Sequence, residues 1–261
     1  LSLQSRMLHF KDMWPGVVMS TSTLRSIYKW NSIKQRKFKV KPKMTMRQLE
    51  SRRNRLLEVL PKVMALKDSK VPFYFVDETM YTANDKVDHV WLPPGESICF
   101  RPDIMRFKAI AVVAAIDMKG KIVSMMMKHK FIDQFDFAEF LDMLYMKAKK
   151  RPVNIFLDNL AVHRTIHVRE TAEMNKQTLV FNGPYTSELN PIEHLWQMAK
   201  FRFRRNLITE KNYLNDNKMF SLVRKCIRSV PKKLVKKYVE ICFRKMPGYM
   251  QGLPERIQYP D

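Results

Sequence analysis

The sequence predicts an α/β fold in which a buried sheet is flanked by helices. Short apolar runs with strand-like composition recur along the chain, and turn residues bound them. In the second half these runs alternate with segments of helical periodicity, which indicates parallel pairing of the strands there. The chain has 261 residues, of which 46% are hydrophobic, so it can bury a sizeable core in one large domain.

The N-terminal part is predicted to be helical and basic. Residues 18–30 have the periodicity of a short helix, with Ser and Thr available as caps at its start. The polar segment that follows ends at Pro42 and is predicted to be an extended linker. Between Arg25 and Arg53 the chain carries eleven Lys and Arg residues against one acid.

The elements of the main domain follow from periodicity and capping. A long helix is expected from Thr45 to about Lys67, because Thr45 and Gln48 form a capping box. A buried strand is expected next, with Asp77 at its C-terminal end. The later elements are expected as a hairpin of strands 108–116 and 121–127, helix 136–149, strand 152–157, helix 165–175, strand 178–181 and helix 190–205.

The charge of the chain indicates a polyanionic partner. The formal net charge is +23 and the isoelectric point is about 10.0. Self-repulsion of this size destabilises a compact state, and bound phosphate relieves it. Nucleic acid is the first candidate, an anionic membrane surface the second, and a merely basic protein the alternative. No apolar run is long enough for a transmembrane helix. The cysteine spacing fits neither zinc nor disulfides, which predicts a reduced, intracellular compartment.

Three acids stand where a metal site could form. Asp77 and Asp158 each follow a strand predicted to be buried, and ligand sites in α/β sheets gather at such strand ends. Glu193 falls in the first turn of a predicted helix. Hard oxygen ligands without Cys or His suit Mg²⁺ or Mn²⁺ rather than zinc. Two such ions can clamp the attacking and leaving oxygens of a phosphodiester.

Each of these acids also has an ordinary structural explanation. An Asp after a strand is often a turn or cap residue. Glu193 follows Asn190 by three residues, which fits a capping box. Trp196 has core spacing and is interpreted as a core residue rather than a base-stacking surface. Other acids near Asp77 compete with it for the first position, namely Glu78, Asp85 and Asp88.

Three motifs resemble those of the mariner/Tc superfamily of DDE transposases. They are, in order, FYFVDETMYTANDKVDHVWLPPGE, VNIFLDNLAVHR and GPYTSELNPIEHLWQMAK. Between Asp158 and Glu193 lie 34 residues, the spacing of one branch of that superfamily. The chain departs from the family pattern at Thr186-Ser187 and Leu160, and neither departure removes a ligand.

The resemblance implies a ribonuclease-H-like, retroviral-integrase-like fold with a mixed five-stranded sheet flanked by helices. In that fold the first and fourth strands are neighbours, which would bring Asp77 beside Asp158. The resemblance further implies that Asp77, Asp158 and Glu193 hold Mg²⁺ or Mn²⁺, expected to be two ions. The implied activity is metal-dependent DNA cleavage and strand transfer on double-stranded DNA, as a homodimer or larger assembly. Three motif neighbours are expected to support the ligands, namely Asn159, His163 and Asn190.

The resemblance also divides the chain. Residues 1–44 are expected to be a partial helix-turn-helix with a basic linker, a short helical and extended segment. Residues 45–261 are expected to be the catalytic domain with a basic C-terminal helical tail. The predicted DNA-binding residues are Arg25, Lys29, Arg36, Lys37, Lys39, Lys41, Lys43, Lys200, Arg202, Arg204 and Arg205.

Two other functions fit the same sequence. One is a non-cutting DNA-binding protein descended from a transposase, and the other is a structural subunit of a larger assembly. Metal-dependent cleavage separates the leading hypothesis from both. No membrane partner is expected. The expected location is the nucleus in a eukaryote, and otherwise the cytoplasm with the chromosome.

Overall fold

The computed structural model describes Met7 and residues 13–31, 45–82, 108–209 and 216–251. By its contacts the chain divides into two units, residues 1–44 and 45–261. The first unit contains helix α2 (Thr21–Trp30). Ser20 caps this helix, because its side chain accepts a hydrogen bond from the backbone N–H of Thr23. A short helix therefore forms where the periodicity predicts one.

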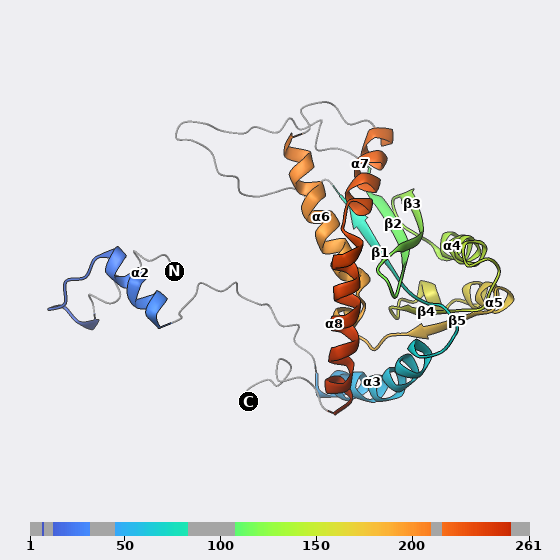
Figure 1. The fold of residues 1–261 in the computed structure, drawn as a ribbon, viewed down its shortest axis with the longest axis horizontal. Helices are drawn as coiled ribbons and strands as arrows, with labels where there is room; N and C mark the ends of the chain where they lie inside the picture. The colour runs from blue at the N-terminus through green and yellow to red at the C-terminus, as the bar shows by residue number, and fades with distance from the viewer. Residues whose placement is uncertain (1–6, 8–12, 32–44, 83–107, 210–215, 252–261) are drawn as a thin grey trace. The chain divides into compact units, whose positions relative to one another are not determined.

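One mixed sheet of five strands forms the centre of the second unit (Figure 1). The strands are β1 (Phe73–Tyr81), β2 (Ile110–Asp117), β3 (Ile122–His129), β4 (Val153–Leu157) and β5 (Gln177–Phe181). They lie in the order β3-β2-β1-β4-β5. The pairs β1–β2 and β2–β3 are antiparallel, whereas β1–β4 and β4–β5 are parallel. The predicted mixed five-stranded sheet is confirmed.

Helices cover both faces of the sheet, and each face has its own apolar core (Figure 1). On one face lie α4 (Gln134–Lys147) and α5 (Ile166–Met174). On the other lie α3 (Met46–Lys67), α6 (Ile192–Thr209), α7 (Asp216–Arg228) and α8 (Lys232–Gln251). Side chains alternate along β1, so Phe75 packs in the core under α3, α6, α7 and α8, and Val76 packs in the core under α4 and α5.

The strand that carries Asp77 is longer than predicted. We expected it to end at this residue, but β1 continues to Tyr81. The reason is antiparallel pairing with β2, which continues as far as Tyr81 opposite Ile110. Parallel pairing with β4 is described only for residues 73–75 of β1. Asp77 therefore lies within the strand, just past the point where one of its two neighbours stops.

The helix that carries Glu193 begins later than predicted. Residues Ser187–Leu189 form a short 3₁₀ helix, η2, and Asn190 has an extended backbone with φ −96° and ψ 108°. Pro191 explains the break, because a residue before proline is excluded from the helical region. The helix α6 therefore begins at Ile192 and not at Asn190.

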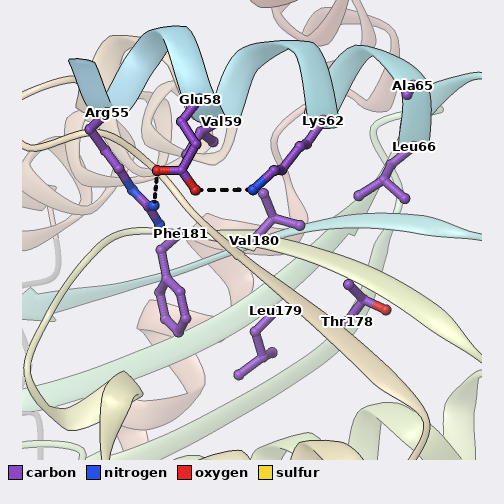
Figure 2. Close-up of a pocket in the computed structure, with 10 residues that line it drawn as sticks. All are labelled: Arg55, Glu58, Val59, Lys62, Ala65, Leu66, Thr178, Leu179, Val180 and Phe181. Carbon is purple, nitrogen blue, oxygen red and sulfur yellow. Dashed lines mark hydrogen bonds and ion pairs between the residues drawn. The ribbon is translucent and has the colours of Figure 1, made fainter. Parts of the chain in front are cut away.

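The long helix α3 begins after Thr45, as predicted, and packs beside the edge strand β5. Thr45 and Gln48 form the predicted capping box. A groove of about 390 Å³ separates α3 from β5 (Figure 2). On its rim Glu58 accepts hydrogen bonds from Arg55 Nη1 at 2.7 Å and Lys62 Nζ at 3.0 Å. These side chains are largely exposed, so the ion pairs stabilise the helix only weakly.

Among the helices of the described residues, none combines the length and apolar character needed to cross a membrane.

Gly120 closes the β2–β3 hairpin against the first turn of α8. Its backbone N–H donates to Asp117 O at 2.9 Å, and its φ is +74°. A Cβ at this position would lie 2.5 Å from the backbone N of Lys236 and 2.7 Å from the backbone O of Lys232. Both the backbone conformation and the close approach therefore require glycine here.

The variant Gly120→Ala is expected to lower the free energy of unfolding by about 2–5 kcal/mol. The left-handed backbone contributes about 1–2 kcal/mol of this and the overpacking about 1–3 kcal/mol. Thermal unfolding should then shift down by about 5 °C or more. The matched control is Gly248→Ala within α8, where nothing lies within 4 Å of the new Cβ. The control should raise stability by up to about 1 kcal/mol; equal melting temperatures would contradict the tight packing.

Candidate metal centre

The sheet brings Asp77 beside Asp158. In the parallel pair β1–β4, Phe75 lies opposite Phe156. Two residues further along each chain stand Asp77 and Asp158, just after β4 ends at Leu157. The two carboxylates therefore share the edge where β4 stops and β1 continues. Sequence alone predicted the end of β4 at Leu157 but could not establish that β1 and β4 are neighbours.

The loop before α6 attaches this helix to β1. The side chain of Asn190 donates a hydrogen bond from Nδ2 to the backbone carbonyl of Val76 at 3.0 Å. One turn into α6, Trp196 Nε1 donates to Asp77 Oδ2 at 2.9 Å. Glu193 lies between these two contacts in the first turn of the helix. All three predicted ligands thus lie in one region of the molecule, but their carboxylate oxygens do not all lie within 4.8 Å of one another.

Trp196 has a second role that the sequence did not predict. It is 3% exposed and packs in the core, as its spacing predicted. Its indole N–H also orients the Asp77 carboxylate, which is 119 residues away in the chain. The indole N–H of a buried tryptophan usually has a hydrogen-bond partner, so the predicted burial of Trp196 was a signal that some polar group contacts it.

Burial and neighbouring negative charge raise the pKa of two carboxylates in this region, Asp77 and Glu193. Burial raises the pKa of Asp77 well above its ordinary value, and the negative charge of Glu193 raises it further. Smaller contributions in the same direction come from Glu78 and Asp158, whereas the hydrogen bond from Trp196 lowers the pKa of Asp77. Burial also raises the pKa of Glu193, ahead of the charge of Asp158. Such a cluster of acids is costly until a cation neutralises it.

His163 lies between two of the acids and is fully buried. Its Nε2 makes a 2.7 Å hydrogen bond with Glu78 Oε1. Its Nδ1 lies 2.9 Å from Asp158 Oδ1 but is poorly aligned for a hydrogen bond, so this contact is electrostatic. Burial by itself lowers the pKa of His163, but the two carboxylates outweigh it and raise that pKa to about 9. The imidazole is therefore a buried cation that joins Glu78 to Asp158.

Glu78 also belongs to this region, although the sequence indicated it only as a competitor of Asp77 for the first position. One of its oxygens, Oε2, is buried without a hydrogen-bond partner in the described structure. Potential ligand atoms of Glu78, Asp158 and His163 all lie within 4.8 Å of one another. Because Asp77 and Glu78 are consecutive in β1, their side chains emerge on opposite faces of the sheet. Both acids lie near Asp158, but they have different partners. Asp77 accepts a hydrogen bond from Trp196 on α6, and Glu78 contacts His163 on the opposite face of the sheet.

The residues of the site fit a divalent cation of the hard type. Asp77, Asp158 and Glu193 offer carboxylate oxygens, the ligands that Mg²⁺ and Mn²⁺ prefer. Asp77 is only 8% exposed, and the acids around it raise its pKa. Asn159, predicted as a supporting residue, follows Asp158 and is half-buried.

The predicted DNA-binding residues have different environments. Arg25 and Lys29 are exposed on α2, and Arg204 and Arg205 are exposed on α6. Arg202 is engaged within the protein, because its Nη1 donates to Ser229 Oγ at 2.8 Å. Lys200 lies over the Tyr81 ring at 5.8 Å, and its charge lowers the pKa of Glu193. Outside the described residues lie the remaining predicted ones, the linker residues Arg36, Lys37, Lys39, Lys41 and Lys43.

Comparison with known proteins agrees with this geometry. Residues 72–215, more than half of the chain, match the model of the DDE superfamily endonuclease family. No curated protein sequence matches the chain.

Solved structures of the Mos1 mariner transposase are similar to this chain in fold. The pre-cleavage Mos1 transpososome is 14% identical, with a TM-score of 0.66 over 99% of this chain and 79% of that chain. The Mos1 mariner paired-end complex with Mn is 16% identical, with a TM-score of 0.65 over 95% and 77%. The Mos1 catalytic domain with raltegravir and Mn is 12% identical, with a TM-score of 0.58 over 85% and 100%.

The three motifs, the matched family model and the shared sheet agree with one another. The predicted resemblance is thus confirmed in family and in fold: the chain belongs to the DDE superfamily of endonucleases, and it has the ribonuclease-H-like fold of the mariner transposases.

Proposed function

We propose that this chain is an active transposase, which cuts DNA at the ends of a mobile element and joins the freed 3′ ends to target DNA. The observation that carries the proposal is the carboxylate of Asp77, beside Asp158 at the end of β4, with its pKa raised by burial and by the charge of Glu193. An acid cluster of this kind is stable when a divalent cation shares it.

In this proposal Asp77, Asp158 and Glu193 hold two Mg²⁺ or Mn²⁺ ions. When bound, these ions supply Lewis-acid polarisation of the phosphodiester and activation of the attacking water or 3′ hydroxyl. The chain's own residues set the geometry. Trp196 orients Asp77 through its indole N–H, and the charge of His163 attracts one oxygen of Asp158.

Basic residues beside the centre are proposed to position the DNA backbone. Lys200, Arg204 and Arg205 continue along α6 from the turn that carries Glu193. Contacts of this kind position a duplex without reading its sequence. The solved Mos1 structures include a paired-end complex and a strand transfer complex, which supports DNA as the partner of this chain. The working form is proposed to be a dimer or larger assembly.

The test is nicking of supercoiled plasmid and joining of a 3′-hydroxyl oligonucleotide by the full chain. Activity with Mg²⁺ or Mn²⁺, and its loss in EDTA, is the expected result. Tight DNA binding without nicking in either metal would instead favour the alternative, a non-cutting DNA-binding descendant of a transposase. That alternative has the same fold, so only the chemistry separates the two.

The variant Trp196→Phe tests how Asp77 is held. Phenylalanine keeps most of the buried ring but cannot donate the 2.9 Å hydrogen bond to Asp77 Oδ2. Partners that orient a metal ligand typically contribute about 10–100-fold in metal affinity or activity. We therefore expect the Mn²⁺ concentration for half-maximal nicking to rise by about 10–100-fold, with the helical circular dichroism spectrum unchanged. An unchanged Mn²⁺ requirement would mean that the indole serves packing alone.

A further inference from the structure

A second charged groove lies away from the metal centre. Its volume is about 530 Å³, and it forms where the β2–β3 hairpin meets α4, the end of α7 and the start of α8. The register of β1 and β2 separates the groove from the metal centre. The hairpin turn begins at Asp117, which lies opposite Tyr74, whereas Asp77 lies three residues further along β1, opposite Ala114. No residue of the metal centre lines the groove.

Four cations from four different elements line this groove. They are Lys121, Lys147, Arg228 and Lys232, and all four are exposed. No acid lines it. Within the described ranges, no ion pair joins any of the four to a carboxylate. Asp117 lies four residues before Lys121 in the hairpin turn, but its carboxylate accepts hydrogen bonds from the backbone N–H groups of Lys119 and Lys121.

Two neutral features of the groove also fit an anion. Ser124 lines it, is 4% exposed, and its hydroxyl has no hydrogen-bond partner in the described structure. Buried hydroxyl groups normally have a partner, so a bound oxygen would complete this one. Helix α8 starts here after Pro231, whose side chain cannot cap it. The free N–H groups and partial positive charge of a helix start favour phosphate.

We propose that this groove binds a phosphate group of the DNA backbone. Positive charge continues beyond it along α7 and α8, where Arg224, Lys225, Lys233 and Lys236 are exposed. A line of cations suits a polymer of phosphates better than a single small anion. The choice of DNA rests on the proposed function, whereas the anion site rests on the groove itself. The groove would hold a stretch of duplex apart from the strand at the metal centre.

The test compares the affinity of two charge-matched double variants for duplex DNA of unrelated sequence. One is Lys121→Gln with Arg228→Gln in the groove. The control is Lys70→Gln with Arg169→Gln, two residues that are also exposed. Each phosphate contact contributes about 0.9 to the slope of log affinity against log salt. The groove variant should therefore lose about 1 from this slope, the contribution of one phosphate, and the control should keep the parent value. Equal losses in both variants would overturn the proposal.

Two further measurements identify the ligand. The variant Ser124→Ala leaves the charge unchanged and is expected to weaken DNA binding by about 2–10-fold, the contribution of one hydrogen bond. In nuclear magnetic resonance spectra, duplex DNA should shift the amide signals of Lys232 and Lys233 in the parent. If inorganic phosphate shifts them at constant ionic strength and the duplex does not, the groove is a small-anion site and the assignment to DNA is wrong.

The result is independent of cleavage. Loss of affinity in the groove variant, in a protein that nicks no plasmid, would support the groove and overturn the proposed transposase activity. Unchanged affinity, in a protein that nicks DNA normally, would do the reverse. Melting temperatures equal to that of the parent confirm that both double variants are folded.

Discussion

Replacing Asp158 by asparagine is expected to lower the rate of metal-dependent nicking by at least about 10³-fold and to leave DNA binding intact. Metal ions supply several kcal/mol of transition-state stabilisation, and each 1.36 kcal/mol is tenfold in rate. Asparagine has nearly the same shape but lacks the charge that, in the proposed function, shares a cation with Asp77. The rate is measured by single-turnover nicking, and binding by fluorescence anisotropy at the same salt concentration.

Asp68→Asn is the matched control for this experiment. Asp68 follows α3, and its side chain is 72% exposed, in contact only with Lys67 at 3.3 Å among the described ion pairs. The control should nick DNA at the parent rate. Full activity in Asp158→Asn would mean that this acid is not a metal ligand, and loss of DNA binding would mean that it has a structural role.

Replacing His163 by alanine is expected to lower the free energy of unfolding by about 3–5 kcal/mol, the usual cost of removing one partner from a buried ion pair. The side chains of His163 and Glu78 are only 1% and 17% exposed, so alanine leaves a largely buried carboxylate without its cation. Thermal unfolding in EDTA should shift down by about 10 °C. Added Mn²⁺ should recover part of the loss, because it restores positive charge beside Asp158.

A second substitution separates charge from packing. In the double variant Glu78→Gln with His163→Gln, neither residue is charged, so much of the lost stability should return. His167→Ala is the control for the histidine itself, because His167 is exposed on α5 and should change stability by less than about 0.5 kcal/mol. If the double variant melts as low as His163→Ala, the shape of the buried ring matters more than its charge.

The sequence predicted most of the elements because their signals are local. The capping box at Thr45 and the alternation of strands with helices each lie within a few residues. Local signals could not predict that β1 and β4 are neighbours in the sheet; only the family resemblance implied this pairing. The end of β1 was misplaced because its extension depends on β2, which begins 29 residues after Tyr81.

The partners of the acids were harder to predict than the acids themselves. Glu78 and His163 are 85 residues apart, and no local pattern links them. Trp196 was correctly interpreted as a core residue, but its bond to Asp77 depends on how α6 lies over the sheet. Similarly, the spacing of Arg202 cannot reveal that its guanidinium binds Ser229 within the protein.

The opposite orientations of Asp77 and Glu78 have a consequence for how the protein would lose activity on heating. Asp77 is held by α6 on one face of the sheet, and Glu78 is held through His163 on the other. A single peptide unit thus connects the catalytic edge to two separate cores. Unfolding of either core would then disturb the geometry of the site. On heating, activity would therefore be lost at the temperature at which the less stable of the two cores unfolds.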